Sequence, residues 1–199
     1  MHKESLVMGI AGVLLGLLAG WVIGSQQAAP GRADTAAVPA TQSASAAPGP
    51  GQQQVVPLDE KQVATLKSTA DANPKDAATR TALGNLYFDA GRFDEAAQWY
   101  ADSLKINPND ANVSTDLGIA YYYQNQPDKA LAQFDRSLEI DPKHTKTLLN
   151  VGIVRAWGKQ DLQGAAKAWE RVIEVAPGTE EAARAKQGLD GIRSAHPPQ

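Results

Sequence analysis

Apolar residues recur at helical spacing through the second half of the chain, and the pattern itself repeats every 34 residues. Gly84, Gly118 and Gly152 occupy the same place in three successive units. An alanine, an aromatic residue four positions later and a proline follow in each unit; they are Ala96, Tyr100 and Pro108, then Ala130, Phe134 and Pro142, then Ala165, Trp169 and Pro177. This period predicts stacked helix pairs, an all-α fold, and favours recognition over catalysis.

Proline and aspartate mark the expected helix boundaries. Each proline ends one helix, and Asp76 and Asp110 are candidate N-caps for the next. The predicted first helices of the units are 76–90, 111–124 and 145–157, and the second helices are 93–106, 127–140 and 162–175. A lone helix over 59–72 and a capping helix over 179–193 cover the two ends. The third unit has one extra residue, which we expect to lengthen its central loop.

Small residues explain how the paired helices can approach closely. A glycine in each first helix is expected to face the alanine of the second helix, with the aromatic residue beside the crossing. These stripes are interpreted as core. In the capping helix, Gly188 and Gly191 predict a frayed end.

The first 24 residues predict a single membrane anchor, because residues 6–23 form an uninterrupted run of apolar and glycine residues. A cleaved signal peptide is the alternative. Gly12, Gly16, Gly20 and Gly24 fall four apart on one face, where a second helix could pack closely, so the anchor is a candidate for self-association. The expected location is a bacterial inner membrane, with the repeats facing the periplasm.

Residues 25–57 predict a disordered linker between the anchor and a repeat domain over 58–195. Ala, Pro, Gly, Gln and Ser dominate this stretch, and Arg32 and Asp34 are its only charges. It has too little apolar surface to offset the entropy of ordering.

Composition excludes several classes of function. The net charge of −3, from 19 basic and 22 acidic residues, argues against nucleic acid. The chain has no cysteine, and His2, His144 and His196 lack ligand spacing, so we expect no metal, no cofactor and no catalytic site. His144 is interpreted as a surface residue at a helix start.

The recurring residues resemble the tetratricopeptide repeat family over three units, at about 76–108, 110–142 and 144–177. The resemblance implies a right-handed superhelix whose first helices line a concave groove for a peptide or extended partner segment. The groove residues it implies are Asn85, Phe88, Asn112, Asp116, Ile119, Tyr122, Tyr123, Lys146, Asn150, Ile153 and Trp157. Some family members clamp a terminal carboxylate. Asn85 and Lys146 fit that clamp, but Thr81, Asp116 and Asn150 do not.

The anchor, linker and repeats together resemble, by architecture alone, envelope proteins that assist complex assembly or cytochrome c maturation. The leading hypothesis is a non-enzymatic, membrane-anchored protein-binding module. The alternative is a self-associating scaffold, built as a homo-oligomer through the glycine face and the stacked repeats.

Overall fold

The computed structural model describes residues 56–195, and this part of the chain is all-helical. Its elements are α1 (Glu60–Ala72), α2 (Ala77–Asp89), α3 (Phe93–Ile106), α4 (Ala111–Tyr123), α5 (Pro127–Ile140), α6 (Thr145–Ile153), the π-helical turn η1 (Val154–Gly158), α7 (Leu162–Val175) and α8 (Glu180–Ala195). The predicted all-α class is confirmed over this range, with helix ends within a few residues of those expected.

Aspartate side chains start several of these helices. Asp59, Asp76, Asp110 and Asp161 each accept a hydrogen bond from a backbone N–H of the following turn, which satisfies a donor that the helix leaves unpaired. Asp76 and Asp110 were expected to do so from their place after Asn-Pro. Pro127 lies at the start of α5, where its fixed φ suits a helix.

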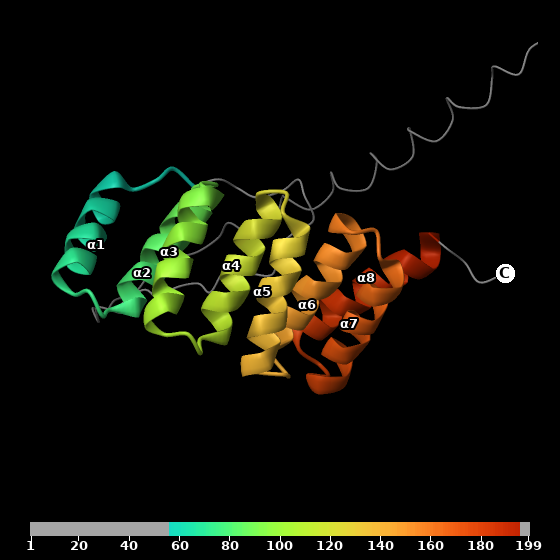
Figure 1. Cartoon of the computed structure of the whole chain (residues 1–199). Coiled ribbons are helices and arrows are strands. Elements are labelled where there is room, and N and C mark those ends of the chain that lie inside the picture. Colours follow the sequence, from blue (N-terminus) through green and yellow to red (C-terminus); the bar gives the residue numbers. More distant parts are fainter. Residues whose placement is uncertain (1–55, 196–199) are drawn as a thin grey trace, which may run out of the picture. The chain divides into compact units, whose positions relative to one another are not determined.

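The helices form a row in which each packs against its neighbours in sequence (Figure 1). The helices α2 and α3, α4 and α5, and α6 and α7 pack as pairs within the units, and contacts between α3 and α4 and between α5 and α6 join one pair to the next. Because short turns connect them, consecutive helices run antiparallel and the first helices α2, α4 and α6 all point the same way. Their carboxyl ends therefore lie on one side of the row.

Each unit repeats a glycine in its first helix and an aromatic residue in its second. The main reason for the glycine is the aromatic ring itself, rather than the expected contact with the alanine of the second helix. A Cβ on Gly84 would lie 2.5 Å from the ring of Tyr100, and one on Gly118 would lie 2.4 Å from that of Phe134. In the third unit a Cβ on Gly152 would lie 2.1 Å from Nε1 of Trp169. The ring itself occupies the place of the missing side chain in all three units.

The extra residue of the third unit lies in the helix and not in the loop, so that expectation is wrong. Gly91, Asn125 and Gln160 are the residues with positive φ that turn the chain in each unit, and each precedes the alanine of its second helix by five positions. The loop is therefore unchanged in length. The additional residue is taken up by η1, whose wider turn accommodates one more residue than an α-helix would.

Both ends of the row are covered as expected. Val63 and Ala70 of α1 are buried against the first unit, and Ala182, Ala185 and Leu189 of α8 are buried at the other end. The prediction that α8 frays at its glycines is wrong. Gly188 packs against Trp169, with a Cβ there 2.6 Å from the ring, and the helix continues to Ala195.

The predicted anchor (1–24), with its glycine face, and nearly all of the linker (25–57) lie outside the described residues. Among the helices of 56–195, none is both long enough and apolar enough to cross a membrane. The anchor, the linker and the domain boundaries stay predictions.

Candidate functional site

The candidate groove residues come from three parallel helices, and the structure divides them by exposure. Phe88, Asp116, Ile119, Asn150 and Ile153 are buried. Tyr122, Tyr123, Asn85 and Lys146 are partly buried, whereas Asn112 and Trp157 are exposed. The buried members shape this face of the domain, and the others supply its contact area; all remain candidate binding residues.

The charged pair of the face is neutralised internally. Lys146 Nζ of α6 lies 2.6 Å from Asp116 Oδ1 of α4, and their side chains are 17% and 12% exposed. Burial raises the pKa of the Asp116 carboxyl, and the ammonium of Lys146 opposes that shift. The pair joins the second and third units, and it leaves Lys146 engaged within the fold. The face therefore does not offer this lysine as a free cation for a ligand carboxylate.

The asparagines of the face are also engaged in the fold. Asn85 Oδ1 accepts a hydrogen bond from the Tyr100 hydroxyl at 2.8 Å, and burial raises the pKa of that hydroxyl. Asn150 Nδ2 donates to the carbonyl of Lys146 at 2.8 Å. Asn85 and Lys146, the two residues that match a carboxylate clamp, therefore each have a partner within the domain.

A continuous group of aromatic side chains lies at the carboxyl ends of α2 and α4. Tyr123 stacks on Phe93 with ring centroids 4.7 Å apart, and Phe88 meets both rings edge-on. The Tyr122 ring centroid is 5.9 Å from that of Tyr123. Sequence reasoning missed Phe93, because it begins a second helix. Its position directly after the turn was the available signal.

The end of the turn η1, in the third unit, lies against this group. A Cβ on Gly158 would lie 3.3 Å from Cε2 of Tyr122, so the end of η1 contacts the tyrosine. Trp157, the preceding residue, is 54% exposed, with its ring centroid 5.8 Å from that of Trp169. We call Phe88, Phe93, Tyr122 and Tyr123 the aromatic ridge; Trp157 is a separate exposed ring.

A buried hydroxyl cluster positions the start of α6. Thr115 Oγ1 lies 2.6 Å from Thr147 Oγ1 and 3.0 Å from Ser137 Oγ, and Ser137 donates to the carbonyl of Ala111. The cluster therefore links α4, α5 and α6 through buried hydroxyl groups that hydrogen-bond to one another and to the backbone.

His144 closes this cluster; it lies at a helix start, as expected, but it is half-buried and hydrogen-bonded within the fold. Its Nδ1 lies 2.6 Å from Thr147 Oγ1, and its Nε2 lies 3.0 Å from Asn112 Oδ1. A neutral ring with the proton on Nε2 satisfies both contacts, donating to Asn112 and accepting from Thr147. Burial lowers the pKa of His144, which favours that neutral form.

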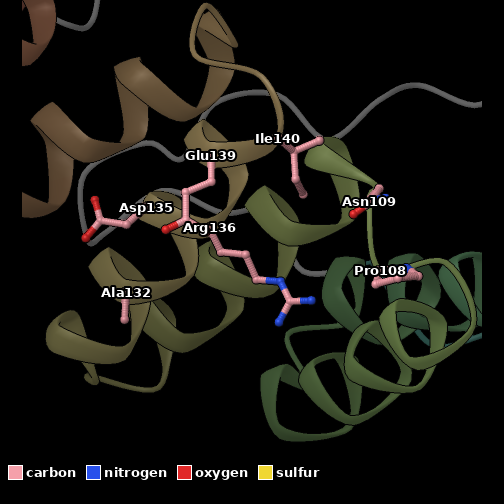
Figure 2. Close-up of a pocket in the computed structure, with 7 residues that line it drawn as sticks. All are labelled: Pro108, Asn109, Ala132, Asp135, Arg136, Glu139 and Ile140. Carbon is pink, nitrogen blue, oxygen red and sulfur yellow. The ribbon is translucent and has the colours of Figure 1, made fainter.

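A separate hollow of about 720 Å³ lies between the α3–α4 connection and α5. Its lining is mainly polar and includes Asp135, Arg136 and Glu139 of α5 with Pro108 and Asn109 of the connection. Figure 2 shows the guanidinium of Arg136 extending from α5 toward the side of Pro108 and Asn109, whereas Asp135 points away from it. These residues were not singled out in the sequence.

The described part of the chain offers no assembled centre for metal chemistry. Within residues 56–195, no group of three or more His, Cys, Asp or Glu side chains could hold an ion. The arrangement suits contact with a partner: an apolar ridge beside a face whose charges are paired.

Two family profiles match the repeat region. One described as "TPR repeat" matches residues 84–125, and one described as "Tetratricopeptide repeat" matches residues 111–144. No curated protein matches the chain in sequence.

Solved structures of similar fold include the crystal structure of MamA, which is 20% identical with a TM-score of 0.56 over 66% of this chain and 78% of its own. The first TPR domain of human RPAP3, solved by NMR, is 26% identical with a TM-score of 0.53 and is covered completely by 62% of this chain. The first TPR of Spaghetti (RPAP3), solved bound to the HSP90 peptide SRMEEVD, is also 26% identical, with a TM-score of 0.53 over 58% of this chain and 94% of its own. These likenesses support a superhelical arrangement of the helix pairs.

Proposed function

The chain belongs to the tetratricopeptide repeat family, and from that premise we propose that its repeat domain is a non-enzymatic module that binds an extended segment of a partner protein. The fold supports a role in protein–protein interaction. The similar RPAP3 domain has been solved with a bound peptide, which supports a peptide as the kind of ligand.

The observation that carries the proposal is the exposure of Trp157. A tryptophan that is 54% exposed presents contact area that the fold itself does not use, although its ring also lies beside that of Trp169. Tryptophan and tyrosine lose little rotamer entropy on binding and are enriched at binding hot spots.

The paired charges indicate which peptides fit. Because Lys146 is held by Asp116, the face does not present this cation to an acidic tail. We propose that the partner segment is uncharged or apolar where it meets the aromatic ridge, with side chains such as proline, valine or leucine. Such groups pack well against aromatic rings.

We further propose that the module works in a bacterial envelope, anchored in the inner membrane with the repeats in the periplasm. The apolar run 6–23 and the linker that follows it support this placement. Assembly of envelope complexes or cytochrome c maturation is the role we propose, and a segment awaiting incorporation or cofactor attachment would be the ligand.

Replacement of Trp157 by alanine tests the binding face. Peptides selected from a displayed library of short random sequences by the full chain should bind the Trp157→Ala variant about 30-fold more weakly, corresponding to about 2 kcal/mol for a hot-spot residue. The affinity is measured by fluorescence anisotropy with labelled peptide.

Arg136→Ala is the matched control, because it alters the hollow of Figure 2 and leaves the ridge intact. Unchanged affinity is expected. If Arg136→Ala weakens binding and Trp157→Ala does not, the binding surface is the hollow and the proposal is wrong.

Crosslinking in native membranes followed by mass spectrometry tests the proposed role. Recovery of an envelope protein or a c-type cytochrome precursor, lost with Trp157→Ala, supports it. Recovery of this chain alone, abolished by replacing Gly16 and Gly20 with isoleucine, would instead establish the self-associating scaffold.

A further inference from the structure

At the carboxyl end of α2, one carboxylate has no partner among residues 56–195. Asp89 is the last residue of this helix, and within that range its side chain makes no hydrogen bond and no ion pair. The last four backbone carbonyls of the helix, 86–89, all accept hydrogen bonds, that of Asp89 from the N–H of Val56 at 2.9 Å. The carboxylate is therefore the acceptor that this helix end leaves available.

The contacts of Tyr100 place Asp89 on the side of α2 that faces α4. Asn85 lies one turn before Asp89 on the same side of the helix, and its Oδ1 accepts a hydrogen bond from the Tyr100 hydroxyl at 2.8 Å. The pKa of that hydroxyl is raised by burial first, and then by the negative charges of Asp116 in α4 and of Asp89. Both carboxylates therefore lie close to one hydroxyl between the two helices.

Basic side chains near these two helices are held by other groups. Lys146 lies 2.6 Å from Asp116 and balances that carboxylate. The guanidinium carbon of Arg92 lies 5.0 Å from the centroid of the Tyr87 ring. Tyr87 is two residues from Asp89, about 200° around the helix, so this arginine lies toward the other side of α2. The space between α2 and α4 thus has one more carboxylate than it has cations.

The position of Asp89 is unfavourable for a carboxylate that meets only water. Although Asp89 is exposed, neighbouring groups remove part of its hydration, and this burial raises its pKa. The helix dipole also disfavours an anion at a carboxyl end, and the last turn of α2 contains no basic residue to offset it. A charge that reduces stability and has no partner in the fold is typical of a binding surface.

The aromatic ridge begins at the residue before this carboxylate. The ring centroid of Phe88 lies 5.7 Å from that of Tyr123 in α4, and the centroid of Tyr122 lies 5.9 Å from that of Tyr123. Aromatic rings attract cations to their faces, and the aliphatic stems of lysine and arginine pack against apolar surface. A carboxylate next to such rings suits a basic side chain.

We propose that Asp89 binds a lysine or arginine side chain of the partner segment, beside the residues of that segment that pack on the aromatic ridge. This inference rests on the proposed function, because it adds a charged position to the same ligand. The unbalanced carboxylate disfavours acidic segments, and it sets the direction in which the segment lies, with the basic residue at the α2 end.

Paired changes in protein and peptide test this contact. The probes are the short peptides that the full chain selects from the displayed random library, each also made with its lysines and arginines replaced singly by glutamine. Asp89→Asn keeps the shape of the side chain and removes its charge; because that charge is unfavourable in the free protein, the variant should be no less stable. Asp135→Asn is the matched control, since it removes the same charge from an exposed side chain at the hollow of Figure 2.

Asp89→Asn should weaken binding of the selected peptides about tenfold in fluorescence anisotropy, and one glutamine replacement in each peptide should weaken it by a similar factor. The two changes together should weaken binding no more than either alone, because both remove the same contact. Asp135→Asn should leave the affinity unchanged. A peptide with glutamate at the basic position should bind Asp89→Lys more tightly than it binds the parent.

Effects that multiply when the two changes are combined would overturn the proposal, since the two groups then act independently. Selected peptides without lysine or arginine, or equal losses in Asp89→Asn and Asp135→Asn, would also overturn it. If Trp157→Ala weakens binding and Asp89→Asn does not, only the basic contact is wrong. If Asp89→Asn weakens binding of basic peptides and Trp157→Ala does not, the contact is supported and the proposed role of Trp157 is wrong. A library that yields no binding peptide overturns both.

Discussion

At the scale of single residues, the most demanding position in each unit is the glycine of the first helix. The same glycine meets a tyrosine, a phenylalanine and a tryptophan in successive units, and the distances from a hypothetical Cβ show that none of these rings leaves room for a methyl group. In the third unit the ring is also tied by a hydrogen bond from Trp169 Nε1 to the carbonyl of Leu149, at 3.1 Å. The indole therefore cannot move aside without losing that bond.

Gly152→Ala should lower the free energy of unfolding by about 1–3 kcal/mol, the usual cost of overpacking, although alanine is intrinsically the better helix former. Denaturant unfolding measures the change. Gly191→Ala is the control, because a Cβ there would meet nothing within 4 Å, and it should stabilise the protein by up to about 1 kcal/mol. A stabilising Gly152→Ala would contradict the steric account.

At the scale of elements, the junction between the second and third units contains several buried or partly buried polar contacts. It combines the Asp116–Lys146 ion pair with the hydroxyl cluster closed by His144. His144 also lies at the N-terminus of α6, where the helix dipole disfavours a positive charge. The junction is thus arranged around an uncharged imidazole.

Stability should fall as the pH drops below about 6.5. The pKa of His144 is lowered by burial, and by Lys146, against the opposing effect of Asp141, Asp116 and Asp110. Because the unfolded chain then binds a proton more readily than the folded one, stability is complete above the ordinary histidine pKa of about 6.5. It is lost between that value and the lower pKa of the folded state.

Unfolding curves at a series of pH values measure this effect, and His144→Asn, which places a good N-cap residue before α6, is the comparison. The asparagine variant should show a flatter dependence over the same interval. Parallel curves for the two proteins would show that His144 does not control the junction.

At the scale of the whole domain, the stability of each helix depends on packing against its neighbours in the row. The last helix, α8, covers apolar residues at the end of the row that would otherwise be exposed to solvent. α8 packs on α7 and α6 through Ala182, Ala185 and Leu189. In such linear arrays, stability is a sum of local and nearest-neighbour terms, so damage at one end need not spread to the other.

Ala185→Asp, which places a carboxylate in a fully buried site, should remove hydrogen-exchange protection from α7 and α8 first and leave α2 and α3 protected. Ala183→Asp, on the exposed side of the same helix, should leave the exchange pattern unchanged. Uniform loss of protection from α1 to α8 would indicate one cooperative unit instead.

Much of this architecture could be predicted from the sequence, because it depends on local chemistry. Asp76 and Asp110 were recognisable as N-caps, and Pro127 as a helix start, from their immediate neighbours. Contacts between distant residues were harder: the packing of Gly188 on Trp169, and the bond from His144 to Asn112, join elements that the pattern treats separately.

The site followed the same division. The repeat pattern indicated which helices carry the candidate residues, but a periodic pattern does not distinguish a groove residue from a core residue. Ile119 and Ile153 are therefore buried, although they occupy groove positions. The extra residue of the third unit could be counted in the sequence, but its place within the helix could not be known without the structure.

That extra residue has a consequence for how the domain could change over time. The turn after it keeps the spacing of the other two units, while Trp157 beside it is exposed. The insertion of a single codon can thus change which side chain one repeat exposes, while the turn that connects its two helices stays the same.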